Sequence, residues 1–403
     1  MIVGSPNTRN NQNLGNNSWR KPSNTYSPTG LLNSVRNKFH DGSVLSAVER
    51  KIIAQPAALM QMLGSKTSLY ETMNELHSIT LKVQVDDFER EEQACEHVKQ
   101  EMLSQYPNCS VALYGIRQLG MAHPKSAIYM FFNTGINYCQ ASNENKENQT
   151  RVRGTVYEVM KHCGHCEKVT NWDVQELVTF KHNDTEMNCV VSFTNGFKEQ
   201  NTLLLKSYLK MDKRLRLLML LVTDMVYRYH DISKYFTSYV LNIMVIMFLQ
   251  RIPEPVLPTL FELRNMFPYK KVIIGGFDCG FPKETPCLQS SNHLSVENLL
   301  KGFCAFYKDF NFEDDVVSIL GPELKRSMFC PPYNNTISDE PLNSYLLSLK
   351  NGGNTPKMNC DLPVIVQDPF ELCCNAAEKV NMSVLEVFKM MCQDGFDILS
   401  KWC

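Results

Sequence analysis

The stretch from Val111 to Phe132, VALYGIRQLGMAHPKSAIYMFF, constrains the fold of this chain more than any other. Val111 to Tyr114 is typical of a short buried strand, and Gly115 can take a positive φ or allow a close backbone approach. Arg117 to Ala122 then suits a short helix. Ser126 to Phe132 is apolar and aromatic, which predicts a second buried strand. The order of strand, glycine turn, helix and strand favours an α+β fold with a sheet.

Composition places the chain among ordinary globular proteins. Its 403 residues are 43% hydrophobic and 21% charged, with a formal net charge of -1. This balance gives no global electrostatic argument for nucleic acid, so any basic surface has to be local. The longest apolar runs, near 215–222 and 239–249, are too short to span a bilayer and predict core helices rather than membrane contact.

The first part of the chain, residues 1–40, predicts a disordered basic tail. It is rich in Asn, Ser, Gly and Pro and has no acidic residue before Asp41. Such a segment cannot bury enough apolar surface to fold. A basic arm that touches RNA phosphates and a mitochondrial presequence stay open as alternatives. The basic residues of the tail are Arg9, Arg20, Lys21, Arg36 and Lys38.

Residues 41–200 predict a first domain that contains the sheet. The segment from Val44 to Tyr106 has the apolar spacing of helices, and Pro107 is expected to end the last of them. The polar segment from Gln140 to Arg153 predicts an exposed loop. Leu177–His182 and Met187–Phe193 predict two further strands, joined by a turn at Asn183 and Asp184. This order implies a mixed sheet with helices on one face.

Residues 201–403 predict a mainly helical second domain. Apolar residues from Leu203 to Val222 recur with the spacing of one long amphipathic helix. Leu299 to Phe312 is again helical in pattern. A last helix is expected from Ser383 to Trp402, because Ser383 and Glu386 have capping-box spacing.

The cysteines show no disulfide framework, which favours a reducing compartment. We expect the cytoplasm, with the nucleus or the mitochondrion as alternatives. The segment His162-Cys163-Gly164-His165-Cys166 has a Cys-x-x-Cys spacing, but no second pair stands nearby. We therefore expect a packed helix end and no metal.

Several ordered motifs carry a family resemblance. They are Asn201-Thr202-x-Leu204-Leu205, Phe236-Thr237-Ser238-Tyr239, Pro253-x-Pro255-Val256-Leu257-Pro258, the Phe303 to Ser318 segment with Phe310, Phe312 and Ser318-Ile319, and Asp368-Pro369-Phe370-Glu371 with Asn375. In order and spacing the chain resembles the terminal uridylyltransferases and cytoplasmic poly(A) polymerases of the DNA polymerase β-like nucleotidyltransferase superfamily. The resemblance covers roughly residues 45 to 400. It implies a nucleotidyltransferase mixed sheet followed by a helical central domain with a poly(A)-polymerase-associated region.

In that family, two aspartates on the second strand and one on a later strand bind Mg²⁺ or Mn²⁺. Alternate strand residues point the same way, so Asp-x-Asp presents both carboxylates on one face, and hard cations need such oxygen ligands. Here the corresponding positions are Ala127, Tyr129 and Val190. Ile116 stands where the family has serine. We therefore expect no catalytic residue, no metal ligand and no Mg²⁺ or Mn²⁺ cofactor.

The resemblance implies that other parts of the nucleotide site are retained. The positions are Gly115, Asn201, Ser238, Tyr239, Asp368 and Glu371. Asn201 corresponds to the ribose contact, Ser238 and Tyr239 to phosphate and base stacking, and Asp368 and Glu371 to the base edge. The family's two triphosphate lysines fall at Thr223 and Tyr227, with Arg228 as a possible substitute. The histidine that favours uracil falls at Cys374.

The family resemblance and the missing metal ligands leave three functions open. The first is an inactive pseudoenzyme that acts in RNA metabolism by binding RNA or a protein partner. The second is an active terminal uridylyltransferase, or poly(A) polymerase, with displaced metal ligands. The third is a protein-interaction module that uses the former nucleotide cleft. RNA binding is favoured if basic side chains face the cleft, the candidates being Arg117, Lys125, Lys206, Lys210 and Lys213.

Overall fold

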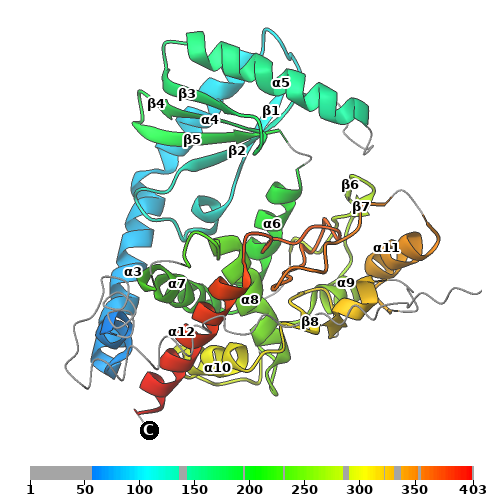
Figure 1. Ribbon diagram of the computed structural model, residues 1–403. Helices are drawn as coiled ribbons and strands as arrows, with labels where there is room; N and C mark the ends of the chain where they lie inside the picture. The colour runs from blue at the N-terminus through cyan, green and yellow to red at the C-terminus, as the bar shows by residue number, and fades with distance from the viewer. Residues whose placement is uncertain are drawn as a thin grey trace, which may run out of the picture.

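A computed structural model of the chain describes residues 57–135, 143–193, 196–229, 232–284, 290–321, 323–330, 337–352 and 355–401. The predicted tail over 1–40 and the helical text from Val44 to residue 56 lie outside these residues. Figure 1 shows a sheet with its helices above and a larger helical part below, with the helix α3 (Lys66–Asp86) at the side of the helical part.

The sheet has five strands, β1 (Ser110–Tyr114), β2 (Ile128–Asn133), β3 (Cys166–Trp172), β4 (Leu177–His182) and β5 (Met187–Ser192). Their order is β1-β2-β5-β4-β3. Only the β2–β5 pair is parallel among these neighbours. The predicted mixed sheet of an α+β protein is therefore confirmed.

Two helices, α4 (Phe88–Met102) and α5 (Asn143–His162), cover one face of the sheet. The core between them contains Val98 from α4, Val156 from α5, and alternate strand residues such as Met130 and Val191. Because successive strand residues point to opposite faces, the intervening residues of β2 and β5 face away from these helices. That second face borders the helical part.

The prediction of an exposed loop from Gln140 to Arg153 was wrong for the described residues, because α5 begins at Asn143. Residues 140–142 lie outside the described chain. The apolar face of α5 starts only at Val152, so its polar first turns resemble a loop in sequence. Arg153 is buried, and its Nη2 donates to Asp173 Oδ1 at 2.7 Å.

The strand β3 was not predicted. It lies at the edge of the sheet, and its side chains are mostly exposed. Its pairing with β4 shifts register between Glu167 and Thr170, where Lys168 has a φ of 55°. An exposed strand with such an irregularity lacks the clean alternation that sequence patterns detect.

The helical part follows from residue 197. Its helices are α6 (Phe197–Met211), α7 (Lys213–Arg228), α8 (Ser238–Arg251), α9 (Leu260–Met266), α10 (Val296–Lys308), α11 (Glu340–Lys350) and α12 (Met382–Ser400). Two small hairpins, β6 (Ile273–Ile274) with β7 (Phe277–Asp278) and β8 (Asp315–Val316) with β9 (Leu324–Lys325), complete it.

Two helix predictions need correction here. The long helix expected from Leu203 to Val222 is two helices, because Asp212 is extended and its carboxylate accepts from the Arg214 N–H at 2.8 Å, which starts α7. The last helix is capped by Asn381, whose side chain accepts from the Val384 N–H, so Ser383 is not its cap.

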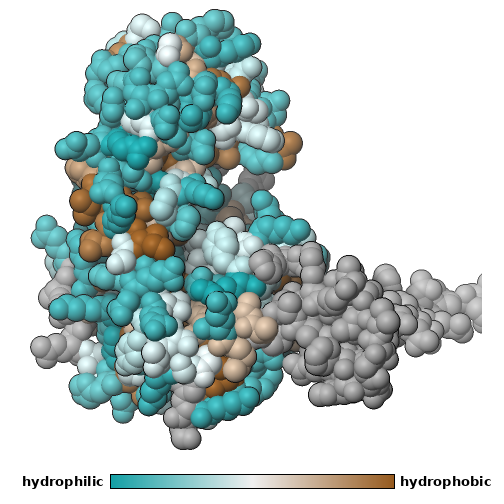
Figure 2. Space-filling model, turned by 90° about the vertical axis from the view of Figure 1, so that its left-hand side faces the viewer, coloured by the Kyte–Doolittle hydropathy of each residue, from teal (hydrophilic) through white to brown (hydrophobic). Residues whose placement is uncertain are grey.

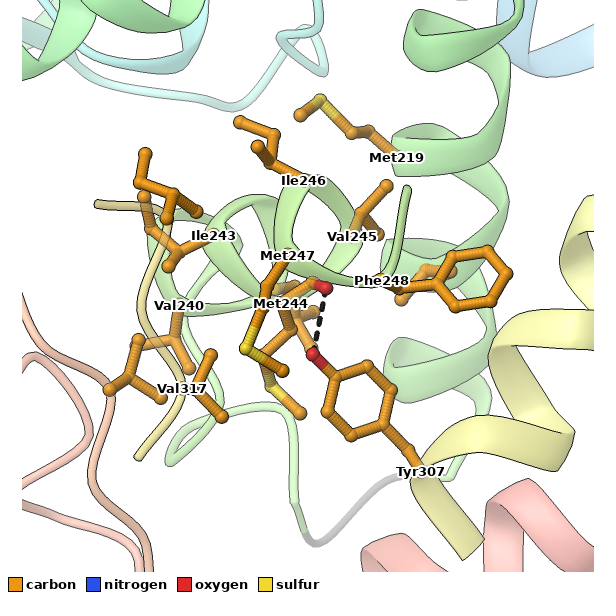
Figure 3. Packing of buried hydrophobic residues seen from close by; sticks show 14 of the residues in the cluster. Met219, Val240, Ile243, Met244, Val245, Ile246, Met247, Phe248, Tyr307 and Val317 are labelled. Atoms are coloured by element: carbon orange, nitrogen blue, oxygen red, sulfur yellow. Dashed lines mark hydrogen bonds between the residues drawn. The ribbon is translucent and has the colours of Figure 1, made fainter. Parts of the chain in front are cut away.

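The helix α8 lies at the centre of the helical core. Every residue from Val240 to Leu249 is buried, which explains why its sequence shows no amphipathic period. Figure 3 shows several of these side chains, from Val240 to Phe248, and the Tyr307 hydroxyl, which donates to the Met244 carbonyl at 2.7 Å. No helix within the described ranges is long and apolar enough to cross a membrane.

The two parts have separate hydrophobic cores. Leu69 of α3 belongs to the helical core, whereas the next helix, α4, belongs to the sheet core. The junction between the two cores is therefore the natural place for a cleft, bordered by the second face of the sheet.

Candidate nucleotide cleft

A cavity of about 620 Å³ lies between the sheet and the helical part. The sheet side contributes Ile116, Ala127 and Tyr129, and α7 contributes the wall opposite. The other lining residues are Leu76, Ile79 and Thr80 from α3, Met121, His123, Lys125 and Ser126 from the loop before β2, Leu220, Thr223, Asp224 and Tyr227 from α7, and Ser238 from α8.

The positions that correspond to the family's metal ligands do come together. Tyr129 of β2 is the register partner of Val190 of β5, in the parallel pair. Ala127 directly precedes β2 and lines the cavity. The rings of Tyr129 and Tyr114 lie 5.6 Å apart between centroids. These three positions thus lie close together on β2 and β5, but they carry a methyl group, a phenol and an isopropyl group instead of carboxylates.

Gly115 closes the first strand of the site. Its φ is +85°, and a Cβ there would lie 3.6 Å from the Tyr129 ring. Its N–H donates to Thr202 Oγ1 of α6 at 2.9 Å. The predicted glycine turn is therefore present, and the family motif at residues 201–205 holds it against the sheet.

The lining residues do not fit Mg²⁺ or Mn²⁺. Among the described residues that line the cavity, Asp224 carries the one carboxylate. Its Oδ2 accepts from Arg228 Nε at 2.7 Å, and burial raises the pKa of this carboxyl. Two-metal chemistry needs several anionic oxygen ligands that converge on the cations. Arg228, considered above as a substitute for a phosphate lysine, is held by this ion pair.

The basic side chains divide into those at the cavity and those used for structure. Lys125 lines the cavity. Arg117 does not face it as a free cation, because it is buried and its Nη1 lies 3.0 Å from both Asp87 Oδ2 and Glu91 Oε1. Lys206 Nζ donates to Gln118 Oε1 at 3.1 Å. Of these three candidate basic residues, Lys125 lines the cavity, whereas Arg117 and Lys206 bind to other side chains of the protein.

Three of the retained residues form one hydrogen-bonded group. Asp368 Oδ2 accepts from Asn201 Nδ2 at 2.6 Å and from the Tyr239 hydroxyl at 2.8 Å. Its Oδ1 accepts the N–H groups of Phe370 and Glu371, both at 2.9 Å. Burial raises the pKa of Asp368. The sequence motifs 201–205, 236–239 and 368–371 therefore meet in space.

Glu371 stands beside this group. Burial, with the Asp368 carboxylate as the second cause, raises the pKa of Glu371 to about 7, and Lys198 acts in the opposite direction. Burial in turn lowers the pKa of Lys198. Ser238, the last of the retained positions, lines the cavity at the start of α8.

Asp224 was missed in the sequence. Helical spacing in α7 places it on the same face as Leu220, Thr223 and Tyr227, all of which line the cavity. The helical spacing could have indicated Asp224 from the sequence, because Thr223 and Tyr227 are assigned to the family's triphosphate lysines on the same face of the helix.

Part of the chain matches a model of a known protein family. Residues 69–210 match a family model described as "Poly(A) RNA polymerase, mitochondrial-like, central palm domain". Over this segment the chain is similar to the terminal uridylyltransferases and poly(A) polymerases. This similarity supports the predicted family, while the activity of the chain is a separate question.

Two curated relatives illustrate the similarity. The mitochondrial poly(A) RNA polymerase of Mus musculus is 26% identical over 232 residues, which are 56% of this chain and 34% of that protein. The terminal uridylyltransferase cid1 of Schizosaccharomyces pombe is 32% identical over 204 residues, which are 49% of this chain and 47% of cid1. The matched region thus spans less than half of either relative.

Solved structures share the fold. A crystal structure of mtPAP in complex with ATPγS superposes with a TM-score of 0.63 and 21% identity, covering 88% of this chain and 71% of that one. The structure of a cytoplasmic RNA terminal U-transferase gives a TM-score of 0.57 and 23% identity, covering 81% and 94%. These similarities establish an RNA terminal nucleotidyltransferase fold for the chain.

Proposed function

We propose that this protein is a catalytically inactive member of the family that acts in RNA metabolism by binding rather than by adding nucleotides. The observation that carries the proposal is the pairing of Tyr129 with Val190 beside Ala127. Removing several parts of one catalytic unit abolishes the chemistry that the unit performs together. The chain therefore uses no Mg²⁺ or Mn²⁺ for transfer.

The phosphate and base positions support the same proposal. Thr223 and Tyr227 line the cavity where the family's lysines would face a triphosphate. Neither side chain carries a positive charge, so a triphosphate would lack the two counterions that these positions supply in the family. Cys374, at the position of the uracil-selecting histidine, is partly buried, and burial raises the pKa of its thiol.

A sugar or base contact is the part of the site that we propose to be retained. Asn201 Oδ1 is buried and has no hydrogen-bond partner, although its Nδ2 is held by Asp368. A buried acceptor without a donor is costly, and a ribose hydroxyl would satisfy it. RNA is the proposed partner because one relative is named a poly(A) RNA polymerase and a similar solved structure is described by its RNA terminal uridylyl transferase activity. The cytoplasm is the proposed compartment.

Primer extension tests the loss of activity. Purified chain, incubated with Mg²⁺ or Mn²⁺, an RNA primer and UTP or ATP, is expected to leave the primer length unchanged. Asp224→Ala serves as the matched variant, since Asp224 is the described carboxylate at the cavity. Extension by the wild-type chain that this variant loses would instead establish an active transferase with a displaced ligand.

A protein-interaction role is the second candidate. Figure 2 shows hydrophobic side chains gathered at mid-height of one face, between the sheet part and the helical part. The exposed hydrophobic residues of α3 and the start of α4 include Leu81, Val85 and Phe88. Exposed apolar patches of this kind often mark partner surfaces. Crosslinking in cells separates the two roles, because recovery of protein without RNA favours this candidate.

A further inference from the structure

A second polar cluster lies on the other side of the sheet part, away from the nucleotide cavity. It consists of His97 on α4, His165 in the turn between α5 and β3, His182 at the end of β4, and Asp184 in the turn between β4 and β5. None of the four lines the cavity. We propose that this cluster is a zinc site that ties these elements together.

The donor atoms converge on one small volume. His97 Nδ1 lies 2.9 Å from His182 Nε2 and 3.6 Å from Asp184 Oδ2. His165 Nδ1 lies 2.8 Å from the same Asp184 oxygen. In a tetrahedral site with bonds of about 2.0–2.1 Å, neighbouring ligand atoms lie roughly 3.3 Å apart. The distances from His97 Nδ1 to His182 Nε2 and to Asp184 Oδ2 bracket this value, so small side-chain rotations place these three donors around one ion.

The choice of zinc follows from the ligand types. Imidazole nitrogens suit Zn²⁺ and its neighbours in the first transition row, whereas Mg²⁺ and Ca²⁺ prefer all-oxygen sites. Two imidazoles and one carboxylate are a ligand set that zinc takes in proteins, with a fourth position left open for a further donor. His97, His182 and Asp184 supply this set, and their ligand atoms lie within 4.8 Å of one another. His165 Nδ1, which contacts the same Asp184 oxygen, lies beside the set rather than within it.

A second layer of contacts already orients the buried ligand. His182 is fully buried, and its Nδ1 pairs with the Thr185 hydroxyl at 2.8 Å. If Nδ1 carries the proton toward this oxygen, the Nε2 lone pair is left to face the cluster, which is the usual arrangement for a metal-bound histidine. Arg90 donates to the Thr185 carbonyl and so holds the turn from the other side.

The turns that carry the cluster are linked before any ion binds. The Asn183 N–H donates to the His165 carbonyl at 2.8 Å, and its side-chain amide donates to the Gly164 carbonyl at 3.1 Å. The side chains of His97, Asp184 and His165 keep between 31% and 45% of their surface exposed. One wall of the site is therefore buried and preorganised, while the other is open for entry of an ion.

The cluster revises how the Cys-x-x-Cys segment is understood. The Cys163 thiol donates to the Met160 carbonyl at 3.3 Å, and Cys166 Sγ lies 3.9 Å from Met160 Sδ. Both cysteines pack against the sheet core. His165, which lies between them in sequence, turns the other way into the histidine cluster. The metal chemistry of this segment thus belongs to its histidine and not to its thiols.

Zinc titration of the full-length chain tests the proposal. The wild-type protein is stripped with a chelator, titrated with ZnCl₂ against a chromophoric zinc indicator, and followed in parallel by thermal unfolding. We expect His97→Gln and Asp184→Asn to weaken the tightest zinc event by at least about 100-fold, and Thr185→Val by about 10–100-fold, as is typical of an outer-shell partner. Zinc should raise the melting temperature of the wild-type chain but not of Asp184→Asn.

His162→Gln is the matched control. His162 belongs to the same pentapeptide, but it is exposed and its Nδ1 contacts the Glu158 carbonyl at 2.7 Å. Its zinc affinity should equal that of the wild-type chain. The proposal is overturned if the folded wild-type chain shows no stoichiometric zinc event, or if His97→Gln and Asp184→Asn, folded by circular dichroism, bind zinc as the control does. The cluster would then be a purely hydrogen-bonded one.

Discussion

Asp368 shows how one buried carboxylate organises the retained side of the cleft. It accepts hydrogen bonds from the side chains of Asn201 and Tyr239 and from the backbone of the 368–371 loop. Four donors offset the cost of burying its charge. Glu371 lacks such a set in the described structure, and burial together with the neighbouring Asp368 charge raises its pKa to about 7.

Replacing Glu371 by Gln should stabilise the protein at high pH. The folded-state pKa of about 7 lies above the ordinary value of 4.5, so the stability that the protonated carboxyl contributes is complete below about pH 4.5 and is lost as the pH rises through 7. The Glu371→Gln variant has no carboxyl group at this position, so it does not lose this stability as the pH rises from about 4.5 to 7. We expect its free energy of unfolding, relative to wild type, to rise by about 1–2 kcal/mol between pH 5 and pH 8.

Urea unfolding at these two pH values measures the difference. Glu378→Gln, an exposed glutamate in the same loop region, is the control and should show no such dependence on pH. A Glu371→Gln difference that stays constant with pH would contradict a raised pKa.

At the scale of elements, the parallel pairing of β2 with β5 determines the cleft wall. The sequence predicted both strands and the turn before β5, because alternation and an Asn-Asp pair are local signals. The resemblance also assigned Tyr129 and Val190 to metal positions; this assignment stays a prediction, and the structure pairs the two residues across β2 and β5. The sequence did not predict β3 or the polar start of α5, because an exposed edge strand and a polar first turn leave no apolar period.

Arg117 ties the segment after Gly115 to α4 and to the loop before β2. Its Nη1 pairs with Asp87 and Glu91 at the start of α4, and its Nε donates to the Ser126 carbonyl at 2.8 Å, just before β2. Replacing Arg117 by Met would leave the buried Glu91 carboxylate without its cation and Asp87 with Arg90 alone. We expect a loss of about 3–5 kcal/mol in the free energy of unfolding, measured with urea.

Lys125→Met provides the comparison for this variant. Lys125 lies in the same loop but is exposed, so its loss should change stability by less than about 0.5 kcal/mol. Equal effects of the two substitutions would show that the Arg117 ion pairs contribute little to holding the loop against α4.

At the scale of the whole molecule, the protein has two hydrophobic cores, and the cavity lies between the sheet part and the helical part. The sequence predicted the sheet part and the helical part because each has its own periodic pattern. It could not predict the histidine cluster, since His97, His165 and His182 are separated by 68 and 17 positions and only tertiary structure brings them together. Nor could the sequence show that Arg117 forms buried ion pairs, because burial and side-chain contacts depend on the tertiary structure.

Calorimetric titration of UTP and ATP into the purified chain, with and without Mg²⁺, tests the central claim most directly. An active site of this family would need Mg²⁺ to bring the triphosphate to its carboxylates. Because Ala127, Tyr129 and Val190 offer no such ligands, we predict that Mg²⁺ leaves the affinity and enthalpy of nucleotide binding unchanged. Tight binding that appears only with Mg²⁺, and that Asp224→Asn removes, would contradict the account.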